Sequence, residues 1–362
     1  MHLSASGLAG TLMAQRSRRA LAGLLGVAGA SLAGAATTVA KKPKKAKLCL
    51  NGQTVSASKK KKKKLVKQGA TPGACPDTCT PQCDGVSCGD DGCGGTCACA
   101  PGTVCDSGVC QACTVSCTGT ATDCGNSLKT ALSTGGTIYA CPGRYGGNFT
   151  IANARLVGAG ATDDATTSTI LDARGSGIVV SVTGTAPVTL ANLQITGGSQ
   201  EGSLGSGVSS AAADLRIEGC VIKQNKGGGV GALNLVMRAT TVTKNTTINS
   251  GGGVQLNGNH CTITDSVISF NKAGGVGGGI SLYGTLSMSG TRVEDNESGS
   301  GGGGISIYDS DLTLDNTCQI TRNKAGSAGG GIFKPNNQYS RVTVGGAAIT
   351  LNTPDNCANF AC

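Results

Sequence analysis

The sequence has no tryptophan, and its five tyrosines and four phenylalanines make up only 2% of the chain. A helical bundle buried by large side chains is therefore not expected, because the apolar residues are mostly Val, Ile, Leu and Ala scattered among 60 glycines. Many short strands fit this composition better. Histidine is scarce as well, and because His2 belongs to the extreme N-terminus, His260 is the one imidazole left for chemistry in the body of the chain.

Acidic residues are missing from the first 76 positions, although 15 of the 30 Lys and Arg residues lie before residue 70. From Asp77 onward the balance reverses to 15 basic against 20 acidic residues. A groove for nucleic acid needs basic residues clustered along one face, so we expect no nucleic-acid partner for the body of the chain.

The N-terminus has the pattern of an export signal: a basic stretch, a weakly apolar Leu/Ala/Gly run and then small residues. This stretch resembles a twin-arginine signal with Ser17, Arg18 and Arg19 as its core, which implies a prokaryotic protein exported in folded form. The apolar run is too short and too rich in Gly for a membrane span. We therefore expect residues 1–36 to be a cleaved signal and the protein to be secreted or attached to the cell surface.

Nineteen cysteines, thirteen of them between Cys49 and Cys124, would be a liability in a reducing compartment unless they held metal. Zinc needs four thiolate or imidazole ligands, usually in paired Cys-x-x-Cys knuckles, and this region offers one such pair, Cys110 and Cys113, without histidine. A disulfide knot over residues 76–124 is the favoured interpretation, and its pairing stays open.

A Lys-rich spacer, residues 37–47, is followed by a segment, residues 48–75, that reads Cys, Asn-Gly, Thr, basic run, Gly, Cys. That pattern resembles a small module of secreted bacterial proteins, and we expect a Cys49–Cys75 disulfide. The Lys59 to Lys64 run is expected to be a solvated strand or turn face, with attraction to anionic cell-wall polymers or phospholipid as the alternative.

The C-terminal body repeats with a period of 20 to 29 residues, which is the most informative feature of the chain. An Ile or Val is followed three residues later by Asn at six places, Asn225, Asn245, Asn271, Asn296, Asn323 and Asn352. A triple Gly followed by Val or Ile recurs in phase and ends at Val230, Val254, Ile280, Ile305 and Ile332. After the first four of these, the next apolar residue falls two positions further on, which is the alternation of a strand. A third apolar segment completes each period.

Three strands in each period predict a parallel β-helix, in which every strand pairs with its equivalents above and below at ~4.8 Å. Stacked asparagines can then share amide hydrogen bonds, and the Gly runs supply positive φ for a sharp corner. Upstream, TIYACPGRYGG and VTLANLQITGG resemble the first coils of the right-handed β-helix family that includes pectate lyases and polymorphic outer-membrane-type repeats.

We therefore predict an all-β fold, a single-stranded right-handed parallel β-helix (a solenoid) of roughly eight coils over residues 125–362, preceded by a small disulfide-rich module. A short helix from Ser127 to Leu132 is expected to cap the first coil, which would otherwise expose an unpaired edge.

Cys220 and Cys318 each lie five residues before a repeat Asn. Four coils apart, they would be separated by ~19 Å, which is too far for a disulfide, so we expect two small buried thiols. Cys357 and Cys362 are candidates for closing the C-terminal end.

Enzymes of this fold family act on acidic polysaccharides with clustered carboxylates and a basic residue near the sugar. Asp163, Asp164, Arg216 and His260 do not reproduce the glycosidase pattern, so Asp163 and Asp164 are interpreted as loop acids. We assign no catalytic residue, no metal ligand and no cofactor, and calcium belongs only to the enzyme alternative.

A stripe of aromatic and polar residues is the best binding candidate. Adjacent coils would stack Tyr283 on Tyr308, in a column with Asn257. The other candidate residues are Asp309 and Asp311 beside the last tyrosine, and Gln255 and Phe333 on the outer face. Rings with polar neighbours suit carbohydrate, whereas the alternative is that outward aromatics only stabilise neighbouring strands.

These features predict a secreted, non-catalytic β-helix protein that acts as a surface or adhesion element or binds carbohydrate. The expected partner is an extracellular polysaccharide or cell-wall polymer. The alternative is a polysaccharide lyase or glycoside hydrolase acting on acidic polysaccharide, which clustered carboxylates on one face would favour.

Overall fold

The computed structural model describes residues 46–50, 53–67, 71–72, 88–90, 96–97, 99–202, 204–337 and 339–362. The chain divides into two compact units, residues 1–75 and 76–362, and each is described by itself. The predicted signal, most of the Lys-rich spacer, and Cys75 of the predicted Cys49–Cys75 disulfide lie outside the described residues. Within the described ranges, no helix is long and apolar enough to cross a membrane.

The first unit contains a small antiparallel sheet in the order β2-β1-β3 and one helix. Its elements are β1 (Ala46–Leu50), β2 (Gln53–Ala57), α1 (Lys59–Lys67) and β3 (Thr71–Pro72). The prediction that the lysine run is a strand or turn was wrong, since it forms the helix α1. Lysine is a good helix former, and the burial of Leu65 holds the helix in the unit.

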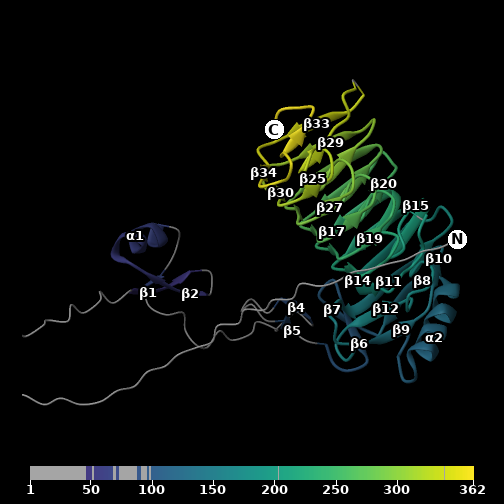
Figure 1. The fold of residues 1–362 in the computed structure, drawn as a ribbon. Helices are drawn as coiled ribbons and strands as arrows, with labels where there is room; N and C mark the ends of the chain where they lie inside the picture. The colour runs from purple at the N-terminus through teal and green to yellow at the C-terminus, as the bar shows by residue number, and fades with distance from the viewer. Residues whose placement is uncertain are drawn as a thin grey trace, which may run out of the picture. The chain divides into compact units, whose positions relative to one another are not determined.

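The second unit is dominated by a right-handed parallel β-helix of about eight turns, which confirms the predicted fold (Figure 1). Each turn contributes a strand to three faces. The first face contains β8 (Gly136–Ala140), β11 (Ala154–Gly160), parts of β14 (Val188–Thr196), β15 (Val208–Glu218) and β17 (Val230–Arg238), β21 (Cys261–Thr264), β25 (Thr285–Ser289), β29 (Asp311–Leu314) and β33 (Arg341–Val344).

The strands β14, β15 and β17 are long enough to turn a corner and belong to two faces each. The second face contains β9 (Gly143–Gly146), β12 (Thr169–Asp172), the end of β14, β16 (Val221–Lys223), β18 (Thr241–Thr243), β22 (Val267–Ser269), β26 (Arg292–Glu294), β30 (Gln319–Thr321) and β34 (Ala348–Thr350). The third face contains β10 (Phe149–Ile151), β13 (Val180–Val182), the beginnings of β15 and β17, β20 (Val254–Leu256), β24 (Ile280–Leu282), β28 (Ile305–Ile307), β32 (Ile332–Phe333) and β35 (Cys357–Ala358).

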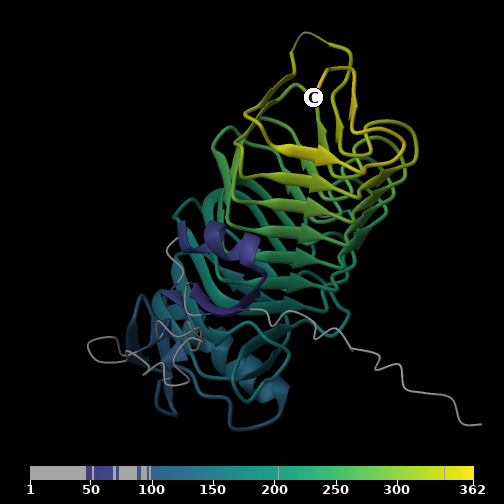
Figure 2. The same cartoon turned by 90° about the vertical axis from the view of Figure 1, so that its left-hand side faces the viewer.

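Between the second and third faces a small fourth sheet stacks two-residue strands. These are β19 (Thr246–Thr247), β23 (Lys272–Ala273), β27 (Glu297–Ser298) and β31 (Lys324–Ala325). Figure 2 shows the parallel strands of neighbouring coils stacked toward the C-terminal coil. The alternating positions predicted to point inward are buried, as Leu256 and Leu282 show with no exposed surface.

The predicted asparagine ladder is confirmed along the corner after the second face. From Asn225 to Asn352, each Nδ2 donates to the Oδ1 of the next asparagine at 3.0 Å, and that same Oδ1 accepts the backbone N–H of the asparagine below. Asn356 closes the C-terminal end of the ladder, and the N–H of Gly198 closes the other end. Each amide therefore satisfies buried backbone groups that the bend removes from the strand pairing.

The residue before each ladder asparagine adopts a left-handed conformation with φ between 56° and 61°. These residues are Gln224, Lys244, Phe270, Asp295, Arg322 and Leu351. Non-glycine residues rarely adopt such φ values, so the stacked ladder holds every coil in the same unfavourable bend.

Glycine is required at two positions of the triple-Gly motif for different physical reasons. Its first glycine has φ between 63° and 72° in the four C-terminal repeats, as predicted for the corner. Its third glycine has no room for a side chain, because a Cβ on Gly304 would come within 2.6 Å of the carbonyl oxygen of Gly331 in the next coil.

A second buried column lies at the corner between the first and second faces. Cys220 and Cys318 lie in it as free, buried thiols, as predicted, and hydroxyl residues fill the coils between them. There the hydroxyl of Ser266 accepts the N–H of Thr240 at 3.2 Å and donates to the carbonyl of Thr264 at 2.7 Å. The column is a structural ladder like that of the asparagines.

The N-terminal end of the β-helix is capped by α2 (Ala121–Thr134), which contains and extends the helix predicted at Ser127 to Leu132. The helix packs against β9, β10 and β8. Its close approach requires glycine at position 125, where a Cβ would come within 1.9 Å of the Gly146 carbonyl oxygen. At the other end, the predicted Cys357–Cys362 disulfide is present.

Before α2, the cysteine-rich segment contains two small antiparallel strand pairs and is part of the same compact unit as the β-helix. Its strands are β4 (Gly89–Asp90), β5 (Thr96–Cys97), β6 (Thr103–Asp106) and β7 (Val109–Ala112). The described disulfides here are Cys88–Cys105, Cys99–Cys110, Cys113–Cys141 and Cys117–Cys124. Cys110 and Cys113 are thus disulfide partners of other cysteines, in agreement with the knot rather than a zinc knuckle.

We expect Asn271→Ala to lower the free energy of unfolding by about 3–5 kcal/mol, because the N–H of Asn245 and the carbonyl of Val242 would lose their buried partner. Urea unfolding with the disulfides intact measures this change. The control Asn249→Ala removes an exposed side chain and should change stability by less than about 0.5 kcal/mol. Equal effects of the two substitutions would contradict a stabilising role for the ladder.

Burial raises the pKa of the Cys220 thiol to about 12 and also raises the pKa of the Cys261 and Cys318 thiols. Because the thiolate is the reactive form, we expect iodoacetamide at pH 8 to leave these three cysteines unmodified in the folded protein. Peptide mass mapping should find them alkylated only after unfolding. Labelling of Cys220 or Cys318 in the folded state would show that the column opens.

Candidate functional site

Two tyrosines lie side by side at the corner between the third and first faces. Tyr283 and Tyr308 follow β24 and β28, and their ring centroids are 5.6 Å apart with a tilt of 43°. Their backbone N–H groups donate to the carbonyls of Leu256 and Leu282 in the preceding coils. The two tyrosine residues remain 41% and 52% exposed, so the corner presents an aromatic pair to solvent.

Of the other predicted site residues, Asn257 lies in the column of the tyrosines, one coil before Tyr283. Gln255 and Phe333 share a neighbouring column, where Ser281 and Ser306 separate them. Those two serines are 1% and 4% exposed, and Phe333 lies against Gly301, where a Cβ would be 2.7 Å from the ring. The structure therefore does not bring Gln255 and Phe333 together at one accessible surface.

The two predicted aspartates already have partners. Asp309 accepts a hydrogen bond from the Asn337 side chain at 2.9 Å, and Asp311 forms an ion pair with Arg341 at 3.1 Å. They shape the corner beside Tyr308 rather than offering free carboxylates.

A shallow groove of about 350 Å³ lies on the outer side of the first face, and sequence reasoning did not find it as a site. Its side chains come from two outward positions of successive coils, the register position shared by Asp214 and Asn234 and the position two residues later. They are Pro187, Thr189, Asp214, Arg216, Asn234, Val236 and His260. The Asn234 amide donates to Asp214 at 2.9 Å, and Arg216 pairs with Glu218 at 3.3 Å, so polar groups surround a small apolar floor.

The groove and the tyrosine pair belong to the same corner of the β-helix. Cys261 pairs in register with Leu286, which places His260 next to Thr285 in the neighbouring coil. Tyr283 precedes Thr285 by two residues. His260 continues the register position of Asp214 and Asn234, and this column becomes visible only once the register is known.

The carboxylates of the β-helix are mostly distributed among ion pairs within a coil or between coils. The pairs are Asp172 with Arg144, Asp265 with Arg238, Glu297 with Lys272 and Asp295 with Arg322. Asp163 contacts Lys223, which lowers the pKa of that carboxyl. Asp164 accepts the N–H and hydroxyl of Thr166, in agreement with its interpretation as a loop acid.

Asp163 and His260 lie on different faces, because Lys223 ends a second-face strand and His260 lines the groove on the first face. Among the described residues, the one close group of three possible metal ligands is Cys88, Cys99 and Cys110. All three sulfurs are in disulfides, which do not offer the thiolate that zinc requires.

The β6–β7 hairpin docks on the first coils through a charged contact. Arg155 donates two hydrogen bonds to Asp106, at 2.5 and 2.6 Å, and the Tyr139 hydroxyl donates to the same carboxylate at 3.0 Å. Val104 packs beside this contact against Val157 and Ala191. The hydrogen bonds from Arg155 hold the pKa of the Asp106 carboxyl below its usual value.

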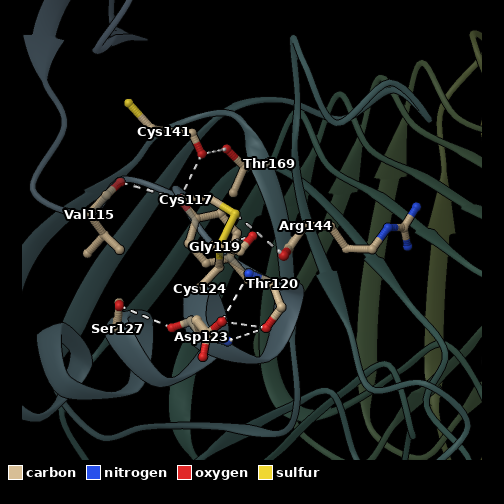
Figure 3. Close-up of a disulfide and its surroundings, with 11 residues drawn as sticks. Val115, Cys117, Gly119, Thr120, Asp123, Cys124, Ser127, Cys141, Arg144 and Thr169 are labelled. Carbon is tan, nitrogen blue, oxygen red and sulfur yellow. Dashed lines mark hydrogen bonds between the residues drawn. A yellow bond between two sulfur atoms is a disulfide. The ribbon is translucent and has the colours of Figure 1, made fainter.

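Figure 3 shows the Cys117–Cys124 disulfide, which joins the segment before α2 to the first turn of the helix. Thr120 and Asp123 form a capping box there, with the Asp123 N–H donating to the threonine hydroxyl. Beside it the Tyr145 hydroxyl donates to the carbonyl of Cys141 at 3.0 Å. This region is a covalently braced cap.

We expect the wild type to exceed Asp106→Asn in stability by about 1.5–3 kcal/mol at pH 7, because the variant loses charged hydrogen bonds from Arg155. Since the folded-state pKa of Asp106 is lowered, the contribution is complete above the unfolded pKa of about 3.9 and fades as the pH falls below it.

Thermal unfolding from pH 7 to pH 2 should therefore show the two proteins converging in acid. The matched control is Asp265→Asn, which removes an exposed ion pair and should cost less than about 0.5 kcal/mol at every pH. A difference between wild type and Asp106→Asn that stays constant with pH would contradict the charged contact.

Residues 155–311 match a family model described as a right handed beta helix region. No curated protein and no solved structure matches the chain. The matched region begins within β11 and ends at the start of β29, so it contains the groove residues and both tyrosines. The comparison agrees with the observed fold.

Proposed function

We propose that the protein is an exported, non-catalytic β-helix protein that binds an extracellular polysaccharide at the corner formed by the tyrosine pair and the groove. The observation that carries this proposal is the exposed, adjacent position of Tyr283 and Tyr308 on a rigid scaffold. The apolar face of a sugar packs on an aromatic ring, while its hydroxyls need nearby hydrogen-bonding groups.

The groove supplies such groups at the same corner. Asn234, Arg216 and Thr189 carry donors and acceptors, and Val236 supplies an apolar floor. Parallel coils repeat every ~4.8 Å, so a chain of sugars can contact several coils in succession. This arrangement suits a polymer better than a single small molecule.

Export is part of the proposal. The disulfides that brace the cap need an oxidising compartment to form and persist. The twin-arginine-like signal would deliver the folded chain to such a compartment. The resemblance of the first coils to pectate lyases and polymorphic outer-membrane-type repeats fits a protein that meets polysaccharide outside the cell.

The test compares the wild type with Tyr283→Ala/Tyr308→Ala on a glycan array and by calorimetry with the best polysaccharide. We expect the double variant to lose at least about tenfold in affinity, because two sugar-stacking rings are removed. Its melting temperature should fall by less than about 4 °C, since an exposed cross-strand pair contributes little to folding.

Phe270→Ala is the matched control, because Phe270 is similarly exposed at 58% but lies at the corner after the second face. Unchanged affinity in the tyrosine variant, together with a large loss of stability, would show that the rings only support each other. Release of shorter or unsaturated sugars by the wild type would instead show a lyase or hydrolase.

A further inference from the structure

The first unit carries a dense positive charge with no internal counter-charge. Between Ala46 and Pro72 the sequence has eight lysines and no acidic residue, and the first carboxylate of the whole chain is that of Asp77. No aspartate or glutamate of this unit can therefore neutralise α1.

The helix α1 displays part of this charge on one face. Leu65 is 9% exposed and is buried. Lys63 and Lys67 are four residues apart and Lys64 and Lys67 are three apart, so these lysines neighbour one another on the side away from Leu65. All three are exposed.

Neighbouring like charges at these spacings destabilise a helix. A bound polyanion would therefore relieve the repulsion among the lysines on this face of α1. Charge complementarity requires an occupant with closely spaced negative groups.

The composition of the unit narrows the class of that occupant. Between Ala46 and Pro72 there is no arginine and no aromatic residue. Binders of single-stranded nucleic acid use stacking rings, and planar bidentate recognition of phosphate favours arginine. Membrane-surface helices need a large exposed apolar face, whereas α1 is nine residues long and buries Leu65.

We propose that the Lys63, Lys64 and Lys67 face of α1 is a docking site for an acidic polysaccharide. The lysine ammonium is a compact charge that makes little demand on orientation, which fits carboxylates displayed along a flexible sugar chain. This site is separate from the tyrosine corner and does not depend on it. It would hold the protein on acidic polymers by salt-sensitive attraction.

The experiment measures binding of the full mature protein to sodium alginate at 20 and 500 mM NaCl. We expect Lys63→Gln/Lys64→Gln/Lys67→Gln to lose on the order of 100-fold in affinity at low salt, and the difference from wild type to shrink at high salt. Circular dichroism and size-exclusion chromatography of the variant check that it folds.

The matched control is Lys129→Gln/Lys226→Gln/Lys244→Gln, which removes the same charge from exposed lysines of the β-helix unit. If this control loses less than about threefold in affinity for alginate, the result supports the α1 face. Equal losses of affinity in the two variants would show that only the net charge of the protein matters and would overturn the proposal. Tighter binding to double-stranded DNA or to phosphatidylglycerol vesicles than to alginate would also overturn it.

A Tyr283→Ala/Tyr308→Ala variant separates this proposal from the tyrosine-corner function. The salt-dependent component of alginate binding should persist in that variant if α1 is the docking site. Its disappearance there, with full binding retained by the α1 variant, would assign alginate to the tyrosine corner instead.

Discussion

Each side-chain amide of the asparagine ladder donates a hydrogen bond to the equivalent asparagine in the next coil. Asn271 accepts from Asn245 and donates to Asn296, and any coil that shifted by one residue would leave these buried groups without partners. The ladder therefore fixes the register of every turn, and the repeated left-handed residue before each asparagine depends on it. The positions of the groove and of the tyrosine pair follow from that register.

The repetitive part of the fold was predictable because its determinants are local and recur. The asparagine period, the triple glycine and the apolar alternation each mark one corner or strand of a coil, and all three appear in the structure where expected. A cap at Ser127 to Leu132 was expected because the first coil would otherwise expose an unpaired edge, and α2 begins earlier, at Ala121. The lysine helix was missed because the run was interpreted as a solvated strand or turn face, whereas lysine is a good helix former and Leu65 is buried.

The candidate site was predictable only in part. Tyr283 and Tyr308 are 25 residues apart, which is one repeat, so their contact follows from the period. Phe333 was expected on the outer face beside Gln255, but it packs against Gly301, and a loop contact of this kind carries no periodic signal. The groove depends on residues such as Asp214 and His260, which share no residue type from coil to coil. The contact of Asp106 with Arg155 joins segments 49 residues apart.

The Cys113–Cys141 disulfide also determines how the molecule would carry mechanical load. Tension entering from the N-terminal segments would pass from Cys113 directly to Cys141, which follows β8 in the first coil. The intervening 27 residues, which include α2 and β8, form a closed covalent loop outside the path of the force. The cap would therefore stay folded over the end of the β-helix while the chain is pulled, and the first backbone hydrogen bonds under load would be those of the coil itself.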